Sequence, residues 1–156
     1  MVTADLASRP LIAVCGGGST DPKRELLAHE TGRILAERGA ILICGGLGGV
    51  MSAAAQGARE AGGLTVGILP GMDKAEANPY IDLALATGLG HVRNTIIVRS
   101  AQGIIALPGE SGTLSEVAFG LTIKRPVVGL QAWADIEGVL PATTPTEAVE
   151  LVLKLL

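Results

Sequence analysis

The chain has 156 residues, of which 48% are hydrophobic and only 2% aromatic, and its formal net charge is −3. We expect one domain over residues 1–156, with a core of small aliphatic side chains and a flexible N-terminus over residues 1–9. The acidic balance provides no basic surface for nucleic acid. The chain also lacks a membrane-spanning apolar run and a secretory pattern at its start, so we expect a cytoplasmic protein with no membrane partner.

The first part of the chain reads as two strand–helix units, each joined by a glycine-rich turn. An apolar strand over residues 11–14 is followed by a turn and by a helix that Asp21 caps and Gly39 ends. A second apolar strand over residues 40–44 precedes another turn and a helix that stops at Gly62. The turn residues singled out are Gly16, Gly17, Gly18 and Ser19 after the first strand, and Gly45, Gly46, Gly49 and Met51 after the second.

The second part of the chain continues this alternation. Strands are predicted over residues 64–69, 81–86 and 103–107, while residues 95–98 form a β-branched run that favours a strand by propensity. Residues 126–130 form the sixth strand, and residues 133–141 read as a loop or a short edge strand. A capping box at Thr144 opens a final amphipathic helix.

Strands that are apolar on both faces and alternate with helices are typical of a parallel sheet between two helix layers. We therefore predict a single Rossmann-like α/β domain with a doubly wound parallel sheet. Its ligands bind beyond the carboxyl ends of the strands, where the strand order reverses. The three glycine-rich turns are expected to meet there. None of them is a P-loop or a complete dinucleotide-binding fingerprint.

The third turn, over residues 108–113, joins an apolar strand to a helix. Its residues are Pro108, Gly109, Glu110, Ser111, Gly112 and Thr113. The spacing of Leu114, Val117, Ala118 and Leu121 predicts that these four side chains face the sheet. Glycines allow the backbone to approach a ligand, and the N-terminus of a helix attracts anions. The turn therefore indicates phosphate binding.

The segment from Pro108 to Glu116 resembles the PGGxGTxxE signature of LOG-type nucleoside 5′-monophosphate phosphoribohydrolases, with Glu110 at a glycine position. Arg93 and Asn94 stand where that family has an Arg-Lys pair. The resemblance extends from about residue 11 to residue 126, makes residues 91–100 a helix and places the chain in the SLOG superfamily. Related sequences have been labelled lysine decarboxylases, but no lysine here has a pyridoxal-type context.

The resemblance implies hydrolysis of an N-glycosidic bond, which yields a free base and ribose 5-phosphate without a metal or cofactor. In this interpretation Glu116 steadies the ribose cation or positions water, and Arg93 acts on developing charge. The remaining turn residues, together with Asn94, would bind the nucleotide and its phosphate. The family also implies a homo-oligomer, either a dimer or a tetramer.

A second resemblance leads to a different class of protein. The short molybdenum-cofactor carrier proteins are similar in length, in residues 87–90 and in residues 68–71. They bind a pterin phosphate and do not hydrolyse it, so the molybdenum cofactor is the ligand in this alternative. Asn94 and Glu110 weaken the enzyme interpretation without favouring the carrier alone.

Several of these residues also have purely structural interpretations. Glu116 could complete a capping box with Thr113, Arg93 could be a solvated helix arginine, and Glu110 is expected to face solvent. Cys15 and Cys44 are expected to be buried free thiols. The two histidines of the chain do not form a metal site by spacing.

Overall fold

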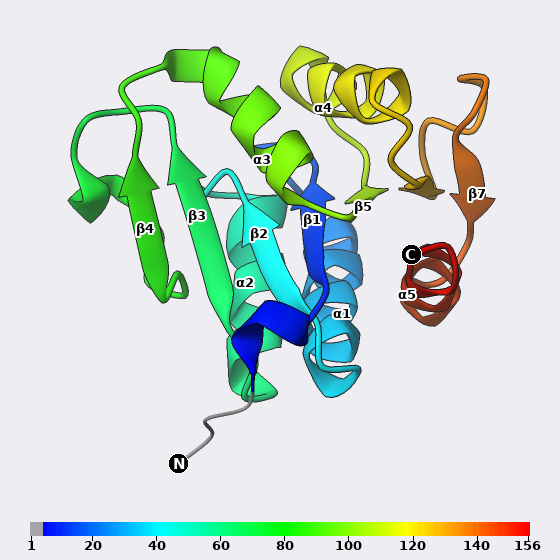
Figure 1. Ribbon diagram of the computed structural model, residues 1–156, viewed down its shortest axis with the longest axis horizontal. Coiled ribbons are helices and arrows are strands. Elements are labelled where there is room, and N and C mark those ends of the chain that lie inside the picture. Colours follow the sequence, from blue (N-terminus) through cyan, green and yellow to red (C-terminus); the bar gives the residue numbers. More distant parts are fainter. Residues whose placement is uncertain (1–4) are drawn as a thin grey trace.

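The computed structural model describes residues 5–156, which form a seven-stranded sheet whose pairings are all parallel (Figure 1). The strands are β1 (Leu11–Cys15), β2 (Ile41–Cys44), β3 (Thr65–Leu69), β4 (Leu83–Ala86), β5 (Gly103–Ala106), β6 (Val127–Leu130) and β7 (Leu140–Ala142). Their order is β4-β3-β2-β1-β5-β6-β7. The chain runs outward from β1 to β4 and then returns to β5 on the other side of β1. This reversal confirms the predicted doubly wound sheet.

Helices cover both faces of the sheet (Figure 1). One face carries α1 (Pro22–Glu37), α2 (Val50–Glu60) and α5 (Pro145–Lys154), and the other carries α3 (Asn94–Ser100) and α4 (Ser111–Thr122). Three short 3-10 helices complete the described chain: η1 (Leu6–Ser8), η2 (Lys74–Glu76) and η3 (Gly90–Arg93). Within residues 5–156 no helix is both long and apolar enough to cross a membrane.

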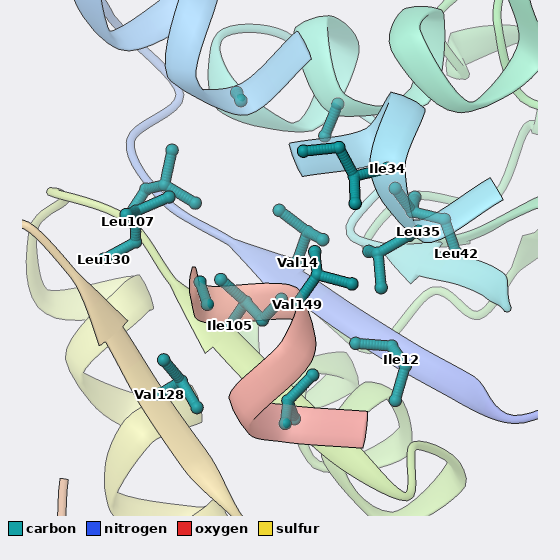
Figure 2. Close-up of a cluster of buried hydrophobic side chains, with 14 of the residues drawn as sticks. Ile12, Val14, Ile34, Leu35, Leu42, Ile105, Leu107, Val128, Leu130 and Val149 are labelled. Atoms are coloured by element: carbon teal, nitrogen blue, oxygen red, sulfur yellow. The ribbon is translucent and has the colours of Figure 1, made fainter. Parts of the chain in front are cut away.

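Alternation along the central strands divides the core into two layers. Figure 2 shows the layer beneath α1 and α5, where Ile12 and Val14 of β1 pack with Leu35 and Val149. Ala13 and Cys15, the intervening residues of β1, pack in the layer beneath α3 and α4. Burial on both faces explains why these strands are continuous apolar runs.

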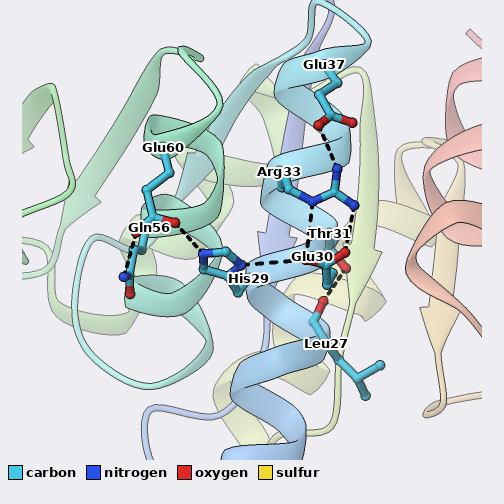
Figure 3. Close-up of polar contacts among 8 residues, drawn as sticks. All are labelled: Leu27, His29, Glu30, Thr31, Arg33, Glu37, Gln56 and Glu60. Carbon is cyan, nitrogen blue, oxygen red and sulfur yellow. Dashed lines mark hydrogen bonds and ion pairs between the residues drawn. The ribbon is translucent and has the colours of Figure 1, made fainter.

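Helices α1 and α2 pack closely because, at their contact, a glycine of each helix lies against the backbone of the other. A Cβ atom at Gly32 would overlap the Ala54 carbonyl oxygen, and one at Gly57 would overlap the His29 carbonyl oxygen. Polar side chains join the same helices at the surface, where His29 Nε2 lies 2.7 Å from Glu60 Oε2 (Figure 3). This packing fixes where the N-terminus of α2 lies at the sheet edge.

Three expectations can be compared with these elements. The helix expected over residues 91–100 is present as η3 followed by α3, and it overrides the β-branched propensity because Ile97 and Val98 are buried against the sheet. Residues 133–141 lead into β7, a parallel edge strand on β6. Of the N-terminus expected to be flexible, residues 1–4 lie outside the described chain, and Arg9 donates from Nε to the Gly39 carbonyl at 2.6 Å.

The predicted inward face of α4 is correct for Val117, which is buried, and for Leu121, which packs against the core, but it is wrong for the other two residues. Leu114 is 43% exposed and Ala118 is exposed as well, whereas the buried residues are Thr113, Glu116, Val117 and Gly120. These four are spaced at i, i+3, i+4 and i+7, so the helical period is correct but its phase is shifted by one residue. The shift carries Glu116 into the interior.

Candidate functional site

The three glycine-rich turns meet at the carboxyl edge of the sheet, as predicted. Gly17 N–H donates to the Pro108 carbonyl at 3.0 Å, and Val50 N–H donates to the Gly17 carbonyl at 3.0 Å. The three turns border a cavity of about 550 Å³, a size typical of small-molecule sites. All predicted site residues line this cavity except Gly46 and Gly49, which lie in the second turn.

Gly49 and Gly109 allow these turns to approach one another. Gly49 has φ +64° and ψ −130°, and a Cβ atom there would overlap the Gly17 carbonyl oxygen. A Cβ atom at Gly109 would overlap Thr113 Oγ1 in its own turn and would also lie 2.9 Å from the backbone nitrogen of Gly17 in the first turn. Any side chain at either position would therefore separate the turns.

Backbone donors at the start of α4 are available to a ligand. The N-cap residue, Glu110, makes no side-chain capping bond, and the first helical bond runs from Leu114 N–H to the Glu110 carbonyl at 3.0 Å. The N–H groups of Ser111, Gly112 and Thr113 have no hydrogen-bond partner within residues 5–156. Because these donors and the helix dipole lie at the cavity, the arrangement suits a phosphate.

The position of α4 tests two expectations from the sequence, the capping box at Thr113 and the exposure of Glu110. Because α4 begins at Ser111, Thr113 lies within its first turn, and the proposed capping box between Thr113 and Glu116 is wrong. Glu110 is exposed, as expected, although it also lines the cavity.

Arg93 is bonded to the ends of two strands. Only 7% of the residue is exposed, so the solvated-arginine interpretation is wrong. Nε donates to the Ile68 carbonyl at 2.7 Å, Nη2 to the Gly45 carbonyl at 3.3 Å, and Nη1 to Asn94 Oδ1. Burial lowers the pKa of the guanidinium, while the charge of Glu116 acts in the opposite direction. The arginine therefore joins β2 and β3 to the start of α3.

Asn94 extends this contact to α4. It is 2% exposed, and its Nδ2 donates to Ser115 Oγ at 3.0 Å and to the Gly112 carbonyl at 3.3 Å. Its Oδ1 accepts from Arg93. Both ends of the amide are therefore bonded within the protein.

Glu116 is a buried acid at the cavity, with 7% of the residue exposed. Burial raises the pKa of its carboxyl to about 7, although the charge of Arg93 and a hydrogen bond with the Cys15 thiol lower it. Among the described residues, Arg93 and Glu116 form no ion pair within 4.0 Å. The carboxyl is thus placed to exchange a proton near neutral pH.

Cys15 and Cys44 are buried free thiols, as predicted. Burial and then the neighbouring Glu116 raise the pKa of the Cys15 thiol. Burial also raises the pKa of Cys44 to about 12. Both thiols are therefore protonated at neutral pH, and no cluster of three or more metal-ligating side chains is found within residues 5–156.

Three residues that line the cavity were not anticipated: Arg24, Leu47 and His91. Arg24 lies in the first turn of α1, directly after the turn that follows β1, and it stands 3.6 Å from Asp21. His91 lies two residues before Arg93, and its Nδ1 is 4.0 Å from the position of a Cβ atom on Gly112. Arg24 could have been predicted to lie near the site, because it closely follows the first glycine-rich turn in the sequence.

Several known proteins have this fold and are similar in sequence. Residues 9–153 match the SLOG cluster4 family. The molybdenum cofactor binding protein of the phototrophic bacterium Rippkaea orientalis superposes with a TM-score of 0.88 and 37% identity, over 94% of this chain and 97% of that one. The molybdenum cofactor carrier protein of Chlamydomonas reinhardtii gives a TM-score of 0.84 and 35% identity, over 94% and 98%.

An enzyme sequence is also similar. The cytokinin riboside 5′-monophosphate phosphoribohydrolase of Mycobacterium tuberculosis is 33% identical over 134 residues, which are 80% of this chain and 71% of the enzyme. Both classes of relative that the sequence resembles are therefore represented among its matches. With its parallel α/β sheet and a match over residues 9–153, the chain belongs to the SLOG cluster4 family.

Proposed function

We propose that this protein binds a phosphorylated small molecule and carries it without cleaving it, with the pterin phosphate of the molybdenum cofactor as its ligand class. The observation that carries the proposal is the unpaired N–H groups of Ser111, Gly112 and Thr113 at the cavity. A phosphate placed there would satisfy these donors and lie at the positive end of the α4 dipole.

The contacts of Arg93 and Asn94 favour carrying over turnover. Catalysis requires groups that interact more strongly with the transition state than with the ground state. Here each of the three guanidinium nitrogens of Arg93 already donates within the protein, and Asn94 is bonded at both ends. These bonds hold both side chains in fixed positions at the cavity wall, as expected for residues that shape a binding site.

The lengths of the cofactor-binding relatives motivate the same proposal. The chain spans 97% of the Rippkaea orientalis cofactor-binding protein and 98% of the Chlamydomonas reinhardtii carrier protein. It spans 71% of the Mycobacterium tuberculosis phosphoribohydrolase. The similarity to the cofactor-binding proteins thus extends over nearly their whole length.

Substitution of Gly112 tests the phosphate site. The nearest atoms to a Cβ at this position are 4.0 Å away, so a Cβ atom fits there and Gly112→Asp adds a carboxylate at the first turn of α4. Acidic residues are tolerated at a helix N-terminus, but this carboxylate would repel a bound phosphate. We expect binding of AMP and of a pterin phosphate, measured by calorimetry, to weaken about tenfold or more.

Gly112→Ala is the matched control, because it adds a side chain of similar position without charge. It should bind both phosphate compounds nearly as wild-type protein does. Equal affinities for wild-type and Gly112→Asp proteins would show that the phosphate lies elsewhere.

Hydrolysis of a nucleoside 5′-monophosphate is the second candidate, favoured by Glu116. A buried carboxyl with a pKa of about 7 at a ligand cavity is suited to acid–base or electrostatic catalysis. If the ionised form stabilises a ribose cation, release of free base should increase as the pH rises through about 7.

Chromatography of the products, with Glu116→Gln as the comparison, distinguishes this candidate from the carrier. The hydrolase requires base release that Glu116→Gln largely abolishes while phosphate binding persists. Binding with no base released by wild-type protein supports the carrier.

A further inference from the structure

A small polar network lies behind the phosphate-binding turn, on the side of α3. Asn94 Nδ2 donates to Ser115 Oγ at 3.0 Å, and Ser115 Oγ donates to the Gly112 carbonyl at 2.6 Å. Asn94 Nδ2 also reaches that carbonyl at 3.3 Å. Two side chains from different helices therefore converge on one backbone oxygen in the first turn of α4.

The carbonyl they hold belongs to the same peptide group as one of the unpaired donors. Because the peptide unit is planar and trans, the Gly112 C=O and the Thr113 N–H point in opposite directions. Because both residues lie in the first turn of α4, the Gly112 carbonyl points along the helix axis and the Thr113 N–H points back toward the start of the helix, where the cavity lies. The bonds from Asn94 and Ser115 to this carbonyl hold the first turn in place. Donors on the oxygen also polarise the peptide group and strengthen its N–H as a donor.

Asn94 is held in place from its other side. Its Oδ1 accepts from Arg93, whose Nε donates to the Ile68 carbonyl at the end of β3. Arg93 also donates to the Gly45 carbonyl, which follows β2. A continuous series of hydrogen bonds thus connects the Gly112 peptide to the ends of β2 and β3.

We propose that Asn94 and Ser115 are positioning residues that hold the Gly112–Thr113 peptide in the orientation that binds a ligand phosphate. This inference rests on the phosphate site of the proposed function. It also gives Asn94 a role that is different from direct ligand contact. Ser115 does not line the cavity, so its influence on phosphate affinity would be exerted through the Gly112 peptide.

Calorimetric titration of the full chain with inorganic phosphate and with AMP tests the proposal. Ser115→Ala should weaken binding of both by roughly threefold, and Asn94→Ala by roughly tenfold, since each removes hydrogen bonds to the turn. The double variant should be no weaker than Asn94→Ala alone, because both side chains act on one peptide group.

Two further variants separate positioning from a general loss of stability. Ser115→Thr keeps a hydroxyl that can reach the preceding turn and should restore wild-type affinity. Thr122→Ala removes a hydroxyl that donates to the Ala118 carbonyl at 2.8 Å in the same helix, and it should leave affinity unchanged. Thermal unfolding of each variant confirms that folded protein is titrated.

The possible outcomes are distinct. If wild-type protein binds phosphate and Ser115→Ala binds it equally well, or if the effects of the two alanine variants multiply independently, the positioning role is refuted while the phosphate site stands. If wild-type protein binds neither inorganic phosphate nor AMP nor a pterin phosphate, the proposed function fails and the inference fails with it.

Discussion

Buried polar residues are concentrated at one place in this protein. Within the described chain they are Thr31, Thr65, Arg93, Asn94, Thr113 and Glu116, and the last four line the cavity. Burial of such groups lowers stability unless hydrogen bonds or opposite charges compensate for it. Arg93 and Asn94 are compensated by several hydrogen bonds, whereas Glu116 is the acid whose ionisation is opposed by burial.

Stability should therefore depend on the ionisation of Glu116. Its pKa is raised from 4.5 to about 7 in the folded chain, so the native state binds a proton that the unfolded state has already lost. Stabilisation from this group is fully present below the unfolded pKa and is lost as the pH rises through the folded value. The free energy of unfolding should fall by up to about 3 kcal/mol between about pH 4.5 and about pH 7 from this group.

Urea unfolding at a series of pH values measures this effect. Glu116→Gln cannot ionise, so its stability should fall less over this range than that of wild-type protein. Glu137→Gln, at an exposed position, should retain the wild-type dependence. If Glu116→Gln and wild-type protein lose the same stability with pH, the carboxyl does not hold its proton in the folded state.

At the scale of elements, helix α4 shows where sequence patterns succeed and where they fail. The strands and the positions of the three turns could be predicted, because apolar runs and glycines follow directly from burial and backbone geometry. The apolar residues of α4 identified its inward face only in part, through Val117 and Leu121. Its buried face contains Thr113, Glu116 and Gly120, which are polar or small because they serve the site and the close packing on β5 and β6.

Side-chain contacts between elements could not be predicted from the sequence either. Arg93 and Asn94 were identified from a resemblance, but nothing in their spacing indicated that they bond to Gly45, Ile68 and Gly112. These partners lie 18 to 48 residues away along the chain. Such contacts depend on the order of strands in the sheet, which is a property of the whole fold.

The contact between α1 and α2 provides a prediction at this scale. At Gly32 a Cβ atom would collide with the Ala54 backbone, which cannot yield without separating the helices. Gly32→Ala should therefore lower the free energy of unfolding by about 3 kcal/mol. Gly120→Ala should lower it by less, about 1 kcal/mol, because its new methyl group would meet side-chain methyl groups of Ile104 and Val127 and no backbone atom of another element.

Chemical denaturation of both variants gives the comparison, with wild-type protein as the reference. An equal loss at the two glycines would mean that the helices can move apart at little cost. In that case the position of α2 at the sheet edge would not depend on this contact.

At the scale of the whole molecule, apolar side chains remain on the surface of the single chain. Leu83 and Leu85 on β4 are 52% and 46% exposed, and Phe119 on α4 is 42% exposed. The homo-oligomer expected from the sequence resemblance stays a prediction, and light scattering on a size-exclusion column measures it. We expect the mass of a dimer or a tetramer, and a monomeric mass over the working concentration range would contradict it.

In the proposed function, the cavity retains an intact phosphorylated ligand. Native mass spectrometry of wild-type and Gly112→Asp proteins, each purified from a host that makes the molybdenum cofactor, tests this claim most directly. We predict that wild-type protein carries one pterin phosphate per chain and that Gly112→Asp carries none. Wild-type protein that carries no pterin phosphate, and that retains ribose 5-phosphate or a free base after incubation with a nucleoside monophosphate, would contradict the carrier and establish cleavage.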